Sequence, residues 1–166
     1  WQLWTPNKAL GLTGVRAAYA IAPPDCEEQA RALAALEPSW PVGAHGVALL
    51  QAWMQASVQQ WLVHSLRTLS GWKARQLALC TDLGWAVHAG SLANYFCAQP
   101  ATSTLQSDLA ALRASGIKLR DATSFGLHGT VRLGVLAPAA QDALQAAWQA
   151  LPGRTIPHSL GSRETL

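Results

Sequence analysis

The sequence predicts an α/β protein in two parts, the second of which is a small α+β layer with helices that cover a sheet. Three observations lead to this fold class. An apolar strand pattern is followed by a helix pattern early in the chain, and a long, mostly helical stretch covers 44–81. The rest alternates in the order β-β-α-β-β-α. We place the boundary inside the helical stretch, with domains at 1–62 and 63–166.

The first part begins with an irregular stretch at 1–14 that is punctuated by glycines. Residues 15–22 form a plausible buried strand, which a proline pair ends. Asp25 is placed to cap a helix that runs to about Leu36. The helical stretch that follows is expected to break at Ser70-Gly71, into two helices or one kinked helix.

The second part opens with two short strands at 85–88 and 94–98, joined by a Gly-Ser turn. A capping-box pattern begins a helix at Ser103, and Gly116 ends that helix. The spacing then predicts two further strands, at 117–121 and at 130–136.

The last predicted element is a helix that Pro138 opens, with Leu144, Trp148 and Leu151 on one apolar stripe. The tail from Pro152 is rich in glycine, proline and serine, and we expect it to fray.

The composition indicates a folded protein and argues against several kinds of partner. With 166 residues, of which 50% are hydrophobic and 13% charged, the chain can build one core or two small units. The net charge of +3 comes from scattered residues, without the basic run of a nucleic-acid surface. No apolar run reaches the ~18 residues that a membrane span needs.

The spacings of cysteine and histidine argue against a disulfide framework and against a metal site. Cys26, Cys80 and Cys97 are odd in number and far apart, which fits reduced thiols in a cytoplasmic protein. No two of the 5 histidines stand at metal-ligand spacing, and we expect no metal.

The stretch WTPNKALGLTGVRAAYAIAP, residues 4–23, places a lysine and an arginine among small and apolar residues. Burial lowers the pKa of a lysine amine, and a neutral amine can form a Schiff base with a carbonyl. Pyridoxal phosphate (PLP) is held in this way, and its phosphate needs hydroxyl, backbone and guanidinium donors. The stretch offers all of these at Thr5, Lys8, Gly11, Gly14 and Arg16.

These residues resemble the lysine segment of the class I and II PLP-dependent aminotransferases, which have fold type I. The shared pattern is a serine or threonine three before the lysine, Gly-x-x-Gly after it, and an arginine eight beyond it. The sequence is similar in particular to the branch of histidinol-phosphate aminotransferase and the threonine-phosphate decarboxylase of cobalamin biosynthesis. The resemblance implies that Lys8 is the Schiff-base lysine and that Thr5 and Arg16 bind the cofactor phosphate. Ala18 departs from the pattern, because the family usually has glycine there.

A second stretch, GIKLRDATSFGLHGTVRLGV, carries two arginines on neighbouring predicted strands. Val131, Leu133 and Val135 alternate on one strand face, so Arg132 points to the opposite face. With Arg120 it makes a plausible clamp for a carboxylate or phosphate. The alternative is that both are solvated strand arginines.

The second stretch resembles the last domain of the same family, where the later arginine grips the carboxylate of the substrate or the phosphate that replaces it. The resemblance gives this role to Arg132, and Arg120 would assist with a second anion. His128 stands where the family often has proline. In SLANYFCAQP, Asn94 resembles a strand asparagine that orients substrate or backbone, although a purely structural role fits equally well. PSWPVGAH resembles an active-site loop, with Gly43 in place of a serine.

The resemblance covers almost the whole chain but only the later part of a family member. It implies the end of the PLP-binding large domain, the connecting helix and the C-terminal small domain. Since the motif stands so near Trp1, we expect a piece of a longer protein whose N-terminal half supplies the rest of the site.

The resemblance leaves the activity of that protein open between several readings. It implies an aminotransferase for an amino acid or amino-acid phosphate and a 2-oxo acid, active as a homodimer. Decarboxylation of threonine phosphate is an alternative. The non-enzymatic alternative is a catalytically empty fragment or interaction module without PLP.

Overall fold

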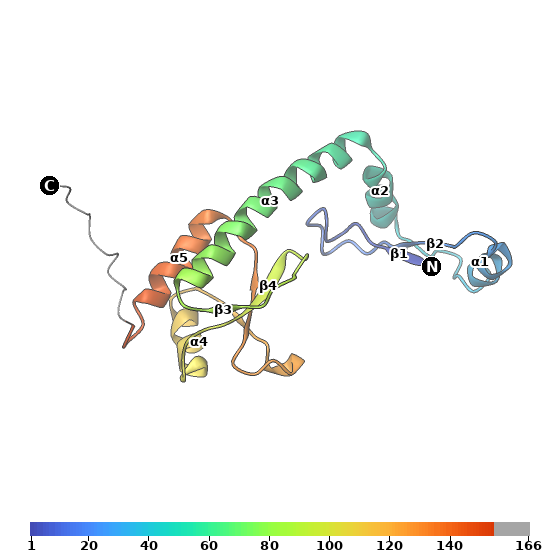
Figure 1. Cartoon of the computed structure of the whole chain (residues 1–166). Helices are drawn as coiled ribbons and strands as arrows, with labels where there is room; N and C mark the ends of the chain where they lie inside the picture. Colours follow the sequence, from blue (N-terminus) through green and yellow to red (C-terminus); the bar gives the residue numbers. More distant parts are fainter. Residues whose placement is uncertain (155–166) are drawn as a thin grey trace. The chain divides into compact units, whose positions relative to one another are not determined.

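The computed structural model describes residues 1–154, which divide into two compact units (Figure 1). The first unit comprises Trp1–Arg67, and the second begins at Thr68. Helix α3 (Ala56–Asp82) contributes to both units. The division into domains at 1–62 and 63–166 stays a prediction. The expected fraying of the tail concerns residues that, from 155 on, lie outside the described range.

The first unit contains a two-stranded antiparallel sheet and two short helices. Strand β1 (Gln2–Trp4) pairs with β2 (Tyr19–Ile21), and Trp4 stands opposite Tyr19. Helices α1 (Glu27–Ala34) and α2 (Ala44–Trp53) follow. Strand β1 lies in the stretch that was expected to be irregular, and β2 is shorter than the predicted 15–22.

The buried apolar contacts of the first unit are few. Ala17 and Leu49 are buried, whereas β2 is exposed or half-buried instead of buried as expected. Gly46 of α2 is required here, because a Cβ at this position would lie 2.5 Å from Val42 Cγ1 and 2.9 Å from the Arg16 carbonyl oxygen. The helix therefore approaches the backbone of residues 16–17 closely.

The helical stretch breaks at a different place from the predicted one. Helix α2 ends at Trp53 and α3 begins at Ala56, while α3 continues without interruption through Ser70 and Gly71. An exposed glycine costs a helix only about 1 kcal/mol, which its neighbours can supply. At the real break, the Gln59 side-chain amide donates to the Trp53 carbonyl oxygen at 2.6 Å and satisfies a helix-end acceptor.

The second unit is an antiparallel sheet of order β3-β4-β6-β5 with helices on one face. Its elements follow the predicted order β-β-α-β-β-α, with one short 3-10 turn, η1, before the last strand. In chain order the bounds are β3 (Ala86–Val87), β4 (Tyr95–Gln99), α4 (Leu105–Ala114), β5 (Arg120–Asp121), η1 (Thr123–Phe125), β6 (Val131–Gly134) and α5 (Pro138–Gln149).

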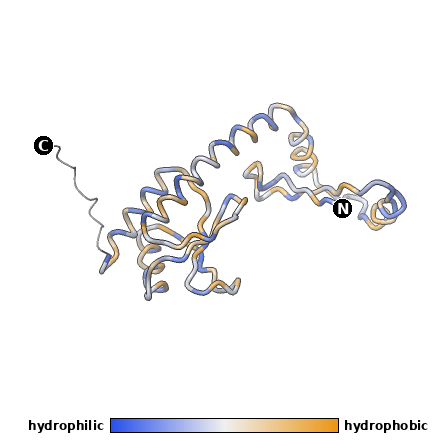
Figure 2. The backbone as a smooth tube through the Cα atoms, in the orientation of Figure 1, coloured by the Kyte–Doolittle hydropathy of each residue, from blue (hydrophilic) through white to orange (hydrophobic). Residues whose placement is uncertain are grey.

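The core of the second unit lies between that sheet and its helices. Phe96 of β4 and Leu133 of β6 are Cα partners, and both are buried. They belong to one cluster with Leu112 of α4 and with Leu144 and Trp148 of α5, which confirms these two residues of the predicted stripe. The third, Leu151, is also in the cluster but lies beyond the end of α5. Helix α5 lies beside α3 (Figure 1), and hydrophobic and hydrophilic residues alternate along both helices (Figure 2).

The start of α4 differs from the predicted capping box, and its end agrees with the prediction. The N-cap is Thr104 instead of Ser103, and its own side chain caps no backbone amide. Thr102 Oγ1 accepts from the Thr104 amide at 3.0 Å. At the other end, Gly116 adopts φ 81°, and the Ile117 amide donates to the Leu112 carbonyl at 2.9 Å.

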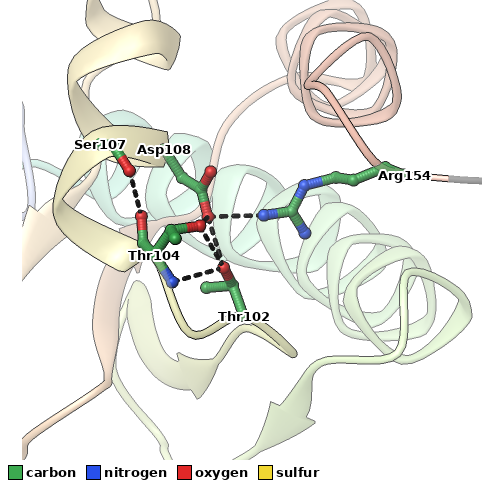
Figure 3. Close-up of polar contacts among 5 residues, drawn as sticks. All are labelled: Thr102, Thr104, Ser107, Asp108 and Arg154. Atoms are coloured by element: carbon green, nitrogen blue, oxygen red, sulfur yellow. Dashed lines mark hydrogen bonds and ion pairs between the residues drawn. The ribbon is translucent and has the colours of Figure 1, made fainter.

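A largely buried ion pair joins the first turn of α4 to the segment that follows α5 (Figure 3). Arg154 donates to Asp108 Oδ2 at 2.6 Å, and Thr102 donates to the same oxygen at 2.6 Å. Only 17% of the Arg154 side chain and 12% of the Asp108 side chain are exposed. The Arg154 guanidinium also stacks 3.3 Å from the ring centroid of Trp148. The pair therefore ties the two helices together.

We predict that Asp108→Ala lowers the free energy of unfolding by about 3 kcal/mol, because it leaves the Arg154 charge buried without a partner. Asp142→Ala is the matched control, since the pair of Asp142 with Arg75 is 58% and 42% exposed and exposed pairs contribute about 0–1 kcal/mol. Urea denaturation followed by circular dichroism measures both. Equal losses in the two variants would contradict the assignment.

Candidate functional site

The predicted cofactor residues of the first unit lie on one loop, residues 5–18, between β1 and β2. The loop is closed at its base by Thr5, whose hydroxyl lies 2.9 Å from the Ala17 carbonyl oxygen and 2.9 Å from Asn7 Oδ1. Asn7 is buried, and its carbonyl accepts from the Leu12 amide at 2.8 Å. These bonds hold the segment around Lys8 in consecutive turns.

Lys8 and Arg16 stand on this loop with exposed side chains. Neither forms an ion pair or a side-chain hydrogen bond with the residues that the structure describes. Burial of Lys8 in an apolar turn was expected from the sequence, whereas its side chain is exposed. Thr5, Lys8 and Arg16 are thus brought to one loop, and their roles stay a prediction.

The two arginines of the second unit stand directly opposite each other. Arg120 of β5 and Arg132 of β6 are Cα partners, and Arg132 is also the Cα partner of Cys97 on β4. Since Val131 and Leu133 are buried on the helix side, Arg132 belongs to the opposite face. Arg120, Arg132 and Cys97 therefore form one row across three strands.

Two aromatic rings accompany these arginines. The Arg132 guanidinium carbon lies 5.0 Å from the ring centroid of Tyr95 and 5.8 Å from that of Phe125. The Arg120 guanidinium carbon lies 4.7 Å from the same Phe125 ring. Within residues 1–154 neither arginine has a carboxylate partner or a side-chain hydrogen bond. Both guanidinium groups thus keep their donors available for an anion.

Asn94 lies immediately before β4 and has an exposed side chain. Its carbonyl oxygen accepts from the Val135 amide at 2.9 Å, so its backbone extends the β4–β6 pairing. The loop before it is held by Lys73 of α3, whose Nζ donates to the carbonyl oxygens of Ser91 at 2.5 Å and Ala93 at 2.8 Å. This structural role of Lys73 has no signal in the sequence.

Asp121 holds the turn that carries Phe125. Its Oδ1 accepts from the Thr123 amide at 2.8 Å and from the Thr123 hydroxyl at 2.7 Å. Its Oδ2 accepts from the Gln106 side-chain amide at 2.6 Å. The bonds from Thr123 and then the bond from Gln106 lower the pKa of the Asp121 carboxyl below its usual value, since they stabilise the charged form.

Sequence reasoning missed Tyr95, Phe125 and Asp121 as parts of this group. All three stand inside stretches whose resemblance was noted, SLANYF and LRDATSFGL. A sequence motif can contain such residues without predicting their contacts. The contact between a ring and a guanidinium group depends on how the strands and the turn bring the two side chains together.

The residues that the structure describes offer neither a metal-binding cluster nor a membrane-spanning helix. Among residues 1–154, no three or more His, Cys, Asp or Glu side chains gather closely enough to hold a metal ion. None of the helices described here has the length and apolar character needed to cross a bilayer.

Residues 5–151 match the model of the family described as aminotransferase class I and II. No match was found among curated protein sequences. Among solved structures, the chain is similar to a protein of Burkholderia pseudomallei provisionally assigned as an aminotransferase, with 26% identity and a TM-score of 0.73. That similarity covers 87% of this chain and 42% of the other.

Two further solved structures share the fold. One is N-succinyldiaminopimelate aminotransferase from Mycobacterium tuberculosis, with 21% identity, a TM-score of 0.66, and 87% of this chain and 41% of the other covered. The second is L-threonine-O-3-phosphate decarboxylase from Porphyromonas gingivalis, with 22% identity, a TM-score of 0.62, and 89% and 45% covered. The chain thus spans less than half the length of these proteins.

We predict that the Thr123 amide resonance titrates with the Asp121 carboxyl, with a midpoint below 3.8, the usual value for this group. A lowered pKa means that the carboxylate stabilises the turn above the pKa of the unfolded chain and ceases to do so as pH falls through the folded value. NMR measures the titration, and Asp121→Asn should abolish it. A midpoint at or above 3.8 would contradict the hydrogen bonds described here.

Proposed function

This chain belongs to the aminotransferase class I and II family, and from that premise we propose that it is the C-terminal portion of a PLP-dependent aminotransferase. Members of this family normally use PLP. The proposed substrates are an amino acid or amino-acid phosphate, of the kind that histidinol-phosphate aminotransferase uses, together with a 2-oxo acid. The observation that carries this proposal is the pair Arg120 and Arg132, which faces away from the core and has no carboxylate partner within residues 1–154.

The donors on the first-unit loop fit the cofactor chemically. Lys8 offers an exposed amine, and Arg16 offers an exposed guanidinium that no described carboxylate neutralises. Thr5 offers a hydroxyl, whose single proton is now directed to Ala17 or Asn7 and would have to be redirected to a phosphate oxygen. Lys8 would therefore hold PLP, and Arg16 with Thr5 would hold its phosphate.

Bound PLP supplies an electron sink for the bond that breaks at the substrate Cα. The chain's own groups then have separate tasks. Once the substrate amine has displaced Lys8 from the cofactor, the released amine of Lys8 would act as the base that moves the proton of the substrate Cα. Arg132 binds the carboxylate, or a phosphate in its place, through two parallel hydrogen bonds, and Asn94 orients the substrate beside it.

Decarboxylation of an amino-acid phosphate is the second candidate. It is favoured by Arg120, because a substrate with both a phosphate and a carboxylate can engage two cationic groups. The product distinguishes the reactions, since transamination yields a 2-oxo acid and decarboxylation releases CO₂.

We assign either activity to a complete enzyme in which these residues are joined by the portion that precedes them in the longer relatives. We further propose a homodimer in the cytoplasm, where Cys26, Cys80 and Cys97 stay as the free thiols observed here. The alternative is a catalytically empty fragment or an interaction module without PLP. The absence of a PLP adduct in the next experiment would indicate this alternative.

In the complete enzyme, borohydride reduction is expected to add PLP to Lys8, as located by intact mass and peptide mapping. Lys8→Ala should lose the adduct and lower kcat by at least about 10²–10⁴-fold, the contribution of a positioned base. Lys118→Ala, which changes another exposed lysine, is the control. An adduct on a different lysine, or none, would refute the role of Lys8.

Arg132→Lys is expected to lower kcat/KM for the acidic substrate by about 10–100-fold, because lysine cannot form the two-pronged hydrogen bond and such charged bonds contribute ~1.5–3 kcal/mol. Arg113→Lys on the exposed side of α4 should leave kcat/KM unchanged. Steady-state kinetics checks both, and equal values for Arg132→Lys and the wild type would overturn the assignment.

A further inference from the structure

We propose that Phe125 is a positioning residue, whose ring holds the guanidinium groups of Arg120 and Arg132 together as one receptor for a dianionic group such as a phosphate monoester. The inference rests on the proposed function, because it takes this arginine pair as the anion site. It adds a residue that touches neither cofactor nor substrate and that acts through the arginines.

The two arginine side chains carry like charges on neighbouring strands and therefore repel each other. Like charges that stand directly opposite on neighbouring antiparallel strands destabilise the pairing. Arg120 and Arg132 are such partners, and no carboxylate within residues 1–154 neutralises either of them. Elsewhere in this unit, Arg75 and Arg154 each pair with an aspartate. Without an opposing attraction, this repulsion would therefore separate the two guanidinium groups.

Phe125 supplies the attraction that opposes this separation. The face of an aromatic ring carries negative potential and attracts a cation within about 6 Å of its centroid. Both guanidinium carbons meet this condition on the one ring, Arg120 at 4.7 Å and Arg132 at 5.8 Å. In the proposed receptor, an anion that binds both groups meets two guanidinium groups that the same ring restrains.

The ring is itself held by a well-bonded turn. The Phe125 amide donates to the Ala122 carbonyl at 2.9 Å, and the fully buried Ala122 donates to the Thr130 carbonyl at 2.9 Å. Asp121 anchors the other end of the turn through Thr123. Gly126 closes it at φ 79°, a conformation that other residues rarely adopt. Since the ring is 53% exposed, removing it leaves the core intact.

The two arginines depend on Phe125 to different degrees, so removal of its ring should affect them unequally. The Arg132 guanidinium carbon also lies 5.0 Å from the centroid of a second ring, that of Tyr95. Among the described residues, Arg120 contacts the Phe125 ring alone. Loss of the Phe125 ring should therefore release Arg120 more than Arg132. Loss of the Tyr95 ring should affect Arg132 alone. A role of Phe125 in folding only would predict no such asymmetry.

The first measurement is NMR of the arginine Nε–Hε groups in the full 166-residue chain. Ring currents should shift the resonances of Arg120 and Arg132 in the wild type. Phe125→Leu should return Arg120 toward its random-coil position and move Arg132 less, while Phe125→Tyr should keep both shifts. Leu92→Ala, at a fully exposed site, is the control. Unchanged Arg120 and Arg132 resonances in Phe125→Leu would overturn the proposal.

The second measurement is titration with inorganic phosphate, followed through the same resonances. Phe125→Leu should weaken phosphate binding about fivefold to tenfold, and Phe125→Tyr should bind within about twofold of the wild type. Equal affinity of Phe125→Leu and the wild type would overturn the proposal even if Arg120→Lys and Arg132→Lys lose binding. If those two lysine variants bind as tightly as the wild type, or the wild type does not bind, the arginine role in the proposed function fails as well.

Discussion

The alternation of side chains along β4 and β6 is the constraint on which the second unit depends. Because every second side chain of a strand points to the same face, turning Phe96 and Leu133 toward the helices turns Tyr95 and Arg132 away from them. Core and candidate anion site are therefore the two faces of one sheet. A shift of register by one residue would exchange them, so the packing that stabilises the unit also places the arginines.

The second unit contains arginines in two different electrostatic environments. Arg154 is enclosed and neutralised by Asp108, with Trp148 beneath it, and the pair serves to join α4 and α5. Arg120 and Arg132 also stack on rings but lack a carboxylate partner among the described residues. A neutralised arginine stabilises the fold, whereas an arginine with free donors is available to a ligand.

The first unit has the loop of the candidate cofactor site but little core of its own. Ala17 and Leu49 are buried, while large apolar side chains such as Leu3 and Met54 are 84% and 83% exposed. The loop around Lys8 is nevertheless well bonded through Thr5 and Asn7. Local hydrogen bonds thus form the lysine turn without a large core.

The sequence by itself determined the elements whose signals are local, and tertiary structure decided those that depend on distant contacts. Pro138 and Gly116 mark helix ends through backbone geometry alone, and both were predicted correctly. The helix break predicted at Gly71 was wrong, because α3 continues across this residue. The break lies where the Gln59 side chain donates to the Trp53 carbonyl oxygen. Lys8 and Arg132 were singled out from sequence motifs, and their roles stay predictions. The contact of the Phe125 ring with both arginines was not predicted, since it depends on strand pairing that brings residues of separate segments together.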